Sequence, residues 1–329
     1  MQCRWYCLIA ILLLLTSVFG QQHEGVSDFD RVLWTDPGDV GARDFRYGVG
    51  GSELQPQPPF RFVDEDMSGT SPKVDVTDIA GRHWNVKWGS EAQPSTFCTR
   101  LIWACGYYAE PEYFIPSGRI IGAKNLNRAS KRLRRDGSFV DARFQLRTDS
   151  PKYLKDVVWK WDENPFVGTH ELQGLKILML LVSNWDPKTS NLRVFEDKSA
   201  GNFRYLYAAV DWGASMGKWG GRFKREKWDC EGFEKQTPDF IKSVENERIK
   251  WGYRGKKRED VTDDITIDDV RWLLQYLGRI TDAQIRDGLE ASGATPQENE
   301  CYARSLRQRI QQLEAAAGAA VARDHASHP

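Results

Sequence analysis

Two kinds of hydrophobic pattern divide the sequence, with short alternations near the N-terminus and longer helical repeats after them. Between residues 60 and 88, apolar and polar positions alternate in the runs 74–76 and 84–88. The turn-like segment 79–82 separates these two runs. The pattern therefore predicts a β-hairpin that carries Lys87 on its second strand.

Helical spacing follows at once, in a segment that ends before Gly106. Ser95 is a suitable N-cap for this helix, and its apolar positions are Phe97, Leu101, Ile102 and Cys105. A second helix is predicted after Thr169, another suitable N-cap. Apolar residues lie on nearly every side of it, at Leu172, Leu175, Leu178, Met179 and Leu181. A helix of this kind belongs in the interior of a domain.

Apolar and polar positions alternate once more in the middle of the chain, and helical spacing then returns in its C-terminal third. Two strand-like runs, 192–196 and 203–210, follow a polar segment. Helices are then predicted over 268–277, after Thr281, and after the capping box that begins at Thr295. This order of elements predicts a mixed α+β fold.

Composition narrows the class of protein. Of the 329 residues, 40% are hydrophobic and 28% are charged, which is typical of a globular chain and excludes a fibrous or disordered one. The 46 basic residues balance the 46 acidic ones, so no overall field draws the chain to nucleic acid. We therefore expect no nucleic-acid partner, and any charged partner must be recognised locally.

The N-terminus has the pattern of a secretory signal peptide. Residues 5–19 are almost wholly apolar, follow Arg4, and lead to Gly20, where a signal peptidase could cleave before Gln21. An uncleaved anchor is less favoured, because a bilayer span needs roughly 20 apolar residues. We expect an exported protein (periplasmic, secreted or in the lumen of the secretory pathway) with no stable membrane span after cleavage.

Cleavage would leave four cysteines. Cys98 and Cys105 are seven residues apart in a helical segment, which places them about 10 Å apart and beyond the reach of a disulfide. We therefore interpret this pair as buried thiols. Whether Cys230 and Cys301 pair is not decided by the sequence.

The polar residues after the buried helix carry the candidate chemistry. The run Asp186-Pro187-Lys188-Thr189-Ser190-Asn191 precedes the two predicted strands, and Asp211-Trp212-Gly213 follows them. Transfer of a phosphoryl group from ATP needs a carboxylate for the attacking hydroxyl, oxygen ligands for Mg²⁺ and a lysine for the phosphates. The two segments and Lys87 contain a candidate for each.

In these motifs and their order, the sequence resembles the protein-kinase-like superfamily, and in particular its HipA-like and related atypical kinases. The resemblance covers roughly residues 61–215 and includes the segment Gly69-Thr70-Ser71-Pro72-Lys73, which is similar to a phosphate-covering loop. It implies a two-lobed fold, with a small β-rich N-lobe and a larger, mainly helical C-lobe. It also implies an ATP- and Mg²⁺-dependent phosphotransferase that acts on a hydroxyl of a protein, a sugar or a lipid headgroup.

The resemblance assigns a role to each candidate residue. Asp186 would orient the acceptor hydroxyl and Lys188 would neutralise developing charge, while Asn191 and Asp211 would hold Mg²⁺. The phosphates of the nucleotide would be bound by Lys87 and by the loop residues Gly69, Thr70, Ser71 and Lys73.

Some positions depart from the family pattern. Asn184-Trp185 replaces the usual His-Arg before the catalytic aspartate. The helix glutamate that should pair with the strand lysine aligns with Ser95, so either Glu91 substitutes for it or the ion pair is missing. A missing pair would favour the alternative of an inactive pseudokinase-type binding protein or a cell-envelope interaction protein. In a third alternative, the Asp and Asn residues bind a metal such as Ca²⁺ without nucleotide.

Each motif also has a plain structural explanation. Asp186 to Asn191 could form a polar turn, Asp211-Trp212-Gly213 could end a strand, and Lys87 could face solvent from an edge strand.

The expected organisation of the chain is a signal peptide (1–20), an irregular extension (21–60), an N-lobe (61–118), a C-lobe (119–315) and a flexible tail (316–329).

Overall fold

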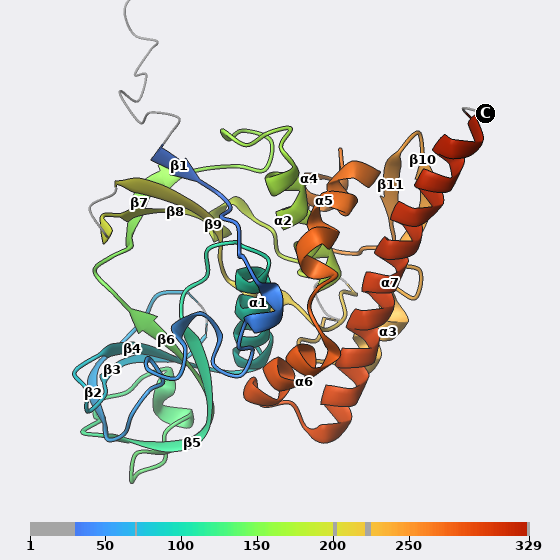
Figure 1. The fold of residues 1–329 in the computed structure, drawn as a ribbon. Coiled ribbons are helices and arrows are strands. Elements are labelled where there is room, and N and C mark those ends of the chain that lie inside the picture. Colours follow the sequence, from blue (N-terminus) through green and yellow to red (C-terminus); the bar gives the residue numbers. More distant parts are fainter. Residues whose placement is uncertain (1–29, 70, 200–202, 221–224, 328–329) are drawn as a thin grey trace, which may run out of the picture.

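The computed structural model describes residues 30–69, 71–199, 203–220 and 225–327. The predicted signal peptide lies outside these residues. The chain has a β-rich N-terminal part and a helical C-terminal part, with helix α1 (Ala92–Ala104) between them (Figure 1). The mixed α+β fold predicted from the sequence is confirmed.

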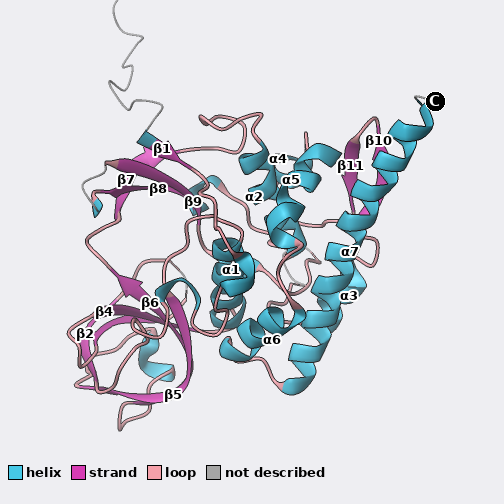
Figure 2. Ribbon diagram, viewed as in Figure 1, coloured by secondary structure: helices cyan, strands magenta, loops and turns pink. Residues whose placement is uncertain are grey.

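A closed five-stranded barrel forms the core of the N-terminal part (Figure 2). Its strand order is β2-β3-β4-β6-β5, and its strands are β2 (Phe60–Glu65), β3 (Lys73–Thr77), β4 (His83–Trp88), β5 (Glu112–Ile121) and β6 (Ser138–Arg147). The predicted hairpin is confirmed as the antiparallel pair β3–β4. Trp84, Val86 and Phe144 fill the barrel because alternate residues of each strand point inward.

The β-rich part extends further along the chain than the range 61–118. Residue 118 lies inside β5, and β6 pairs with both β4 and β5. Without β6 the barrel could not close, so the strands of this part end at Arg147. The expected boundary therefore needs correction, because the pairing of β6 joins segments about 60 residues apart.

Helix α1 begins earlier than predicted. Its N-cap is Glu91, so Ser95 lies within the first helical turns. Pro94 is tolerated there, because the N–H groups of the first helical turn have no acceptor within the helix, so a residue without an N–H loses no hydrogen bond. The Ser95 hydroxyl donates to Glu112 of β5 at 2.8 Å instead of capping the backbone.

A second sheet joins the two parts of the chain. Its order is β1-β9-β8-β7, and its strands are β1 (Arg31–Val32), β7 (Lys152–Val158), β8 (Leu192–Asp197) and β9 (Arg204–Ala209). Strand β1 belongs to the segment expected to be an irregular extension, yet it pairs in parallel with β9. The strands β8 and β9 confirm the two runs predicted after residue 191.

Helices make up most of the remaining chain. They are α2 (His170–Leu181), α3 (Cys230–Gln236), α4 (Arg258–Thr262), α5 (Ile267–Leu277), α6 (Asp282–Ala291) and α7 (Pro296–Ser327), with the hairpin β10 (Ile241–Glu245) and β11 (Arg248–Trp251) between α3 and α4. Thr169, Thr281 and Thr295 cap α2, α6 and α7 as predicted. Helix α7 runs along the helical part and extends into the segment 316–329, which was expected to be a flexible tail (Figure 1).

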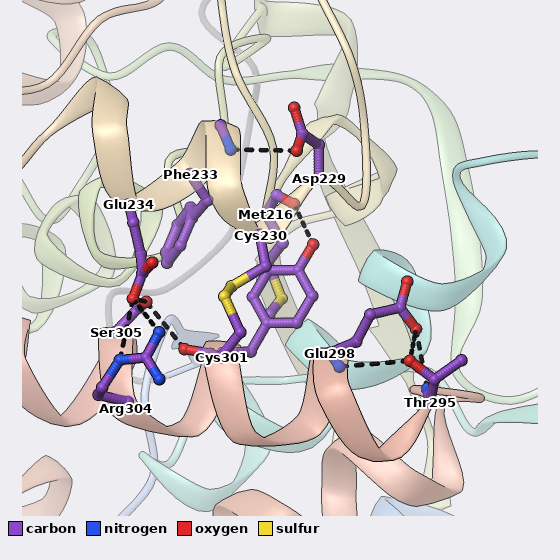
Figure 3. Close-up of a disulfide and its surroundings, with 12 residues drawn as sticks. Met216, Asp229, Cys230, Phe233, Glu234, Thr295, Glu298, Cys301, Arg304 and Ser305 are labelled. Carbon is purple, nitrogen blue, oxygen red and sulfur yellow. Dashed lines mark hydrogen bonds and ion pairs between the residues drawn. A yellow bond between two sulfur atoms is a disulfide. The ribbon is translucent and has the colours of Figure 1, made fainter.

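A disulfide fastens α3 to α7. Cys230 opens α3 and bonds to Cys301 of α7, and near it Glu234 accepts hydrogen bonds from Arg304 and Ser305 (Figure 3). The buried Cys98 and Cys105 remain free thiols, as predicted. Among the residues that the structure describes, no helix is both long and apolar enough to cross a membrane.

Candidate active site

A cavity of about 630 Å³ lies where the barrel, α1 and the loops of the helical part meet. The sequence-predicted residues that line it are Gly69, Ser71, Lys73, Lys87, Asp186, Lys188 and Asp211. Thr70 lies outside the described residues. Asn191 is buried directly beside the cavity wall instead of lining it.

Lys87 points into this cavity and pairs with a glutamate. Its Nζ forms an ion pair with Glu91 and lies 3.9 Å from Oδ1 of Asp211. The Lys87 side chain is only 12% exposed, so it does not extend into solvent from an edge strand. Of the two alternatives that the sequence left open, Glu91 therefore takes the place of the helix glutamate, and the ion pair is present.

Glu91 connects three segments of the chain. Besides Lys87 it binds Lys227, from the segment after Asp211, and it accepts a hydrogen bond from the Ser71 hydroxyl at 3.1 Å. Burial raises the pKa of the Glu91 carboxyl, but the charges of Lys87 and Lys227 outweigh that effect and hold the pKa at about 2. Glu91 is therefore ionised at neutral pH.

The turn after β9 brings Asp211 close to Glu91. Asp211 has a left-handed backbone conformation, with φ 61° and ψ 61°. A side chain at Gly213 would place its Cβ 2.6 Å from the Cβ of Glu91. The glycine of the Asp-Trp-Gly segment is thus needed for this close approach.

Asp186 lies across the cavity and is held by two lysines. Its Oδ2 accepts from Lys188 at 2.8 Å, and its Oδ1 accepts from Lys256 at 3.2 Å. Burial raises the pKa of the Asp186 carboxyl, but these two cations and their hydrogen bonds produce a net lowering. Asp186 is therefore a carboxylate that accepts hydrogen bonds at neutral pH.

Buried contacts fix the loop that carries Asp186. Arg309 of α7 donates to the Leu181 carbonyl at 2.7 Å and to the Ser183 hydroxyl at 2.9 Å, which satisfies the C-terminal end of α2. From the loop after β11, the Tyr253 hydroxyl donates to the Asn184 carbonyl. Asn184, which replaces the histidine of the family pattern, thus takes part in anchoring this loop.

Asn191 and Asp211 are neighbours at the base of the strands β8 and β9. The backbone N–H of Val210 donates to the Asn191 carbonyl at 2.8 Å, so the Asn191 backbone lies beside the residue that precedes Asp211. The Asn191 amide is oriented by a hydrogen bond from its Nδ2 to the Asp186 carbonyl. A carboxylate and an amide oxygen suit Mg²⁺, which keeps several waters and takes few protein ligands. Within the described ranges, no cluster of three or more His, Cys, Asp or Glu residues suits a metal ion.

Lys73 reaches the cavity from β3, directly opposite Lys87 in the antiparallel register. Its Nζ lies 3.0 Å from Oδ2 of Asp66 and donates to the Ser68 hydroxyl at 2.8 Å. Burial raises the pKa of Asp66, but bonds from Ser68 and Lys73 bring it to about 2. Lys73 thus fastens the two ends of the loop that the resemblance assigns to phosphate binding.

A polar wall that the sequence reasoning missed lines the inner cavity. Arg143 of β6 is opposite Lys87 and Gln145 is opposite Asn85, and all three of Asn85, Arg143 and Gln145 are buried. Arg143 pairs with Glu112 at 2.9 Å, while its Nε has no partner among the described residues. Alternation of polar residues over 141–147 was the available signal, because it places Asp141, Arg143, Gln145 and Arg147 on one face of a strand.

The cavity is electropositive although the chain is neutral overall. Among the described residues, five acidic side chains line it, from Glu91, Glu110, Glu112, Asp186 and Asp211. Nine described basic side chains line it too, from Lys73, Lys87, Arg143, Arg147, Lys188, Arg193, Arg225, Lys227 and Lys256. A partly enclosed site with this excess of cations concentrates anions.

No protein-family model and no curated protein sequence matches the chain. Among solved structures, it is similar to the Helicobacter pylori proinflammatory kinase CtkA, with 10% identity, a TM-score of 0.48, and coverage of 80% of this chain and 98% of that one. It is also similar to the Golgi casein kinase with Mn/ADP bound (12% identity, TM-score 0.35, 79% and 73% covered). A third similar structure is the Rio2 kinase from Chaetomium thermophilum in an ADP/Mg²⁺-phosphoaspartate complex (11% identity, TM-score 0.31, coverage of 76% of this chain and 72% of that one). These similarities are remote, so the function is inferred from the residues of the cavity.

Proposed function

We propose that this protein is an ATP- and Mg²⁺-dependent phosphotransferase that acts on a hydroxyl acceptor, as an atypical kinase of the HipA-like type. One observation carries the proposal. Lys87 from the barrel, Asp186 from the loop after α2 and Asp211 from the turn after β9 line the same electropositive cavity. Their residue types are those that phosphoryl transfer requires.

The cavity supplies a place for each part of the reaction. Lys87 and Lys73 would bind the phosphates, helped by the loop that contains Gly69 and Ser71, and Glu91 holds Lys87 in position. Asp186 would accept a hydrogen bond from the acceptor hydroxyl, and Lys188 beside it would stabilise the charge on the transferred group. Asn191 and Asp211 would hold Mg²⁺, which when bound neutralises the phosphate oxygens.

A second candidate is a protein that binds nucleotide without turnover. Both carboxylate oxygens of Asp186 already accept from lysines, which favours this alternative. Absence of an ion pair at Lys87 would also have favoured a protein without turnover. Lys87 does form such a pair, with Glu91. The phosphotransferase is therefore the better supported function.

We also propose that the protein is exported. The Cys230–Cys301 disulfide supports this location, because such bonds persist in oxidising compartments and are rare in the cytosol. The apolar N-terminal segment of the sequence supports it independently.

Thermal unfolding of the full chain tests the function. A ligand that binds only the folded state raises its stability. We expect a higher Tm when ATP and Mg²⁺ are both present than with either alone, and loss of this synergy in Asp211→Ala. An unchanged Tm under all three conditions would contradict the proposal.

A further inference from the structure

We propose that the acceptor carries an anionic group, a phosphate or a carboxylate, within a few bonds of the reacting hydroxyl, and that Lys256 recognises it. This inference rests on the proposed phosphotransferase function. A sugar phosphate or an acidic sugar has this chemistry.

Lys256 is held at the mouth of the cavity by its backbone, so its position is built into the fold. Its N–H donates to the Trp185 carbonyl at 3.0 Å, next to Asp186. The preceding residue must be glycine, because a Cβ at Gly255 would lie 3.0 Å from the Cα of Trp185 and closer still to Tyr253. The two loops therefore dock closely and place the Lys256 side chain beside Asp186.

The side chain of Lys256 is free to exchange partners. It is 46% exposed, and its Nζ lies 3.2 Å from Oδ1 of Asp186, a longer contact than the 2.8 Å bond from Lys188 to Oδ2. Exposed ion pairs of this kind contribute little stability, so a competing anion can replace the carboxylate. Lys256 also lies over the Trp219 ring, 5.8 Å from its centroid, which limits the directions it can take.

Movement of Lys256 to another anion would change the hydrogen bonds that the Asp186 carboxylate accepts. While Lys188 and Lys256 hold both oxygens, the carboxylate has weaker capacity to accept a hydrogen bond from an incoming hydroxyl. An acceptor whose anionic group draws Lys256 away would release Oδ1 for its own hydroxyl. A neutral acceptor must use one of the remaining lone pairs of the carboxylate with both lysines still in place, so the arrangement favours anionic acceptors.

The charge of the cavity agrees with this selection. Among the described lining residues, the nine basic side chains exceed the five acidic ones by four, and Asp66 offsets one of these charges through Lys73, while a magnesium-bound triphosphate carries a net charge of only about −2. Arg225 and Lys227 add to the cationic lining and come from the segment after Asp211. The remaining positive charge suits a second anionic ligand.

The transfer step balances without any further reactant. The acceptor oxygen forms a bond to the γ-phosphorus of ATP, the bond from that phosphorus to the bridging oxygen of ADP breaks, and its electron pair leaves with ADP. The hydroxyl proton, oriented by Asp186, passes to solvent.

Release of ADP from ATP and Mg²⁺, measured with the full chain and matched acceptor pairs, tests the inference. The pairs are glycerol 3-phosphate with glycerol, glucose 6-phosphate with glucose, and gluconate with sorbitol. We expect the anionic member of at least one pair to raise the rate at least about tenfold over its neutral partner. Rates that rise above the acceptor-free background but are equal within every pair would overturn the inference and leave the phosphotransferase function intact.

Variants assign the effect to Lys256. Lys256→Met should raise the KM for the anionic acceptor at least about tenfold with little change in the KM for ATP, and Lys256→Arg should restore most of the preference. Lys250→Met, at an exposed position of β11 outside this cavity, is the matched control and should behave as wild type. An equal loss for anionic and neutral acceptors in Lys256→Met would contradict the assignment.

A binding measurement covers the case in which no acceptor of the set is turned over. With the chain saturated by Mg²⁺ and a non-hydrolysable ATP analogue, inorganic phosphate should bind, and at least about tenfold more weakly to Lys256→Met. Equal binding to both proteins would overturn the inference. Failure of the analogue itself to bind would instead contradict the proposed function.

Discussion

Lys87 and Glu91 form an ion pair between the end of a strand and the start of a helix, and only three residues separate them in the sequence. Lys87 lies in β4, and Glu91 caps α1. The pair is therefore set by the short turn between the two elements, and Lys227 and Ser71 converge on the same carboxylate. Glu91 thus links the segment around Ser71, Lys87 of β4 and the segment after Asp211.

Removal of the Glu91 charge should impair the chemistry more than the fold. In Glu91→Gln, Lys87 and Lys227 lose a shared partner, so we expect ATP turnover to fall at least about tenfold. Glu231→Gln, at an exposed ion pair with Lys235, is the matched control and should retain activity. Wild-type turnover by Glu91→Gln in an ADP-release assay would show that the ion pair has no role in catalysis.

The depressed pKa of Glu91 predicts a pH dependence of stability. Its carboxyl has a pKa of about 2 in the folded state against 4.5 for the unperturbed group, so its stabilising effect is present above about pH 4.5 and is lost as the pH falls toward 2. Urea unfolding should show wild type to be more stable than Glu91→Gln at pH 6, with the difference shrinking between pH 4.5 and 2. A difference that stays constant over this range would mean that the pKa is not depressed.

Gly213 allows the Asp211 turn to lie against Glu91. In Gly213→Ala, the new Cβ would lie 2.6 Å from that of Glu91, so we expect a loss of about 1–3 kcal/mol in the free energy of unfolding. Gly318→Ala is the control, because in the described part of the chain its added Cβ has no contact within 4 Å apart from the neighbouring backbone of helix α7. That change should be neutral or stabilise by up to about 1 kcal/mol. Similar effects of the two substitutions on urea unfolding would argue against close packing at Gly213.

The Cys230–Cys301 bond should stabilise the protein by joining residues 71 apart in sequence. We expect the double variant Cys230→Ser, Cys301→Ser to lose about 2–4 kcal/mol of unfolding free energy. Reducing agent should destabilise wild type by a similar amount and leave the double variant unchanged. If wild type were insensitive to reduction under conditions that break the bond, the disulfide would not contribute to stability.

The local elements could be predicted from the sequence because they depend on short-range patterns. Alternation revealed the β3–β4 hairpin, and Thr169, Thr281 and Thr295 marked the starts of three helices. The start of α1 was misplaced, because Ser95 has the chemistry of a cap but bonds to Glu112, a residue of another strand. A cap preference cannot show that a distant partner competes for the same hydroxyl.

The candidate site was predicted only in part, for a similar reason. Residues in compact motifs, such as Asp186, Lys188 and Asp211, line one cavity. Lys227, Lys256 and Arg143 reach it through loops and strand pairs that no motif marks. The extent of the barrel was missed because β6 pairs with strands on both sides of α1.

The most direct test of the account separates binding from chemistry in the cavity. Calorimetric titration of the full chain with a non-hydrolysable ATP analogue and Mg²⁺ should be compared among wild type, Lys87→Met and Asp186→Asn, with ADP release from ATP measured alongside. We predict that Lys87→Met weakens binding at least about tenfold, while Asp186→Asn binds as wild type but loses ADP release. Wild-type binding by Lys87→Met, or wild-type ADP release by Asp186→Asn, would contradict it.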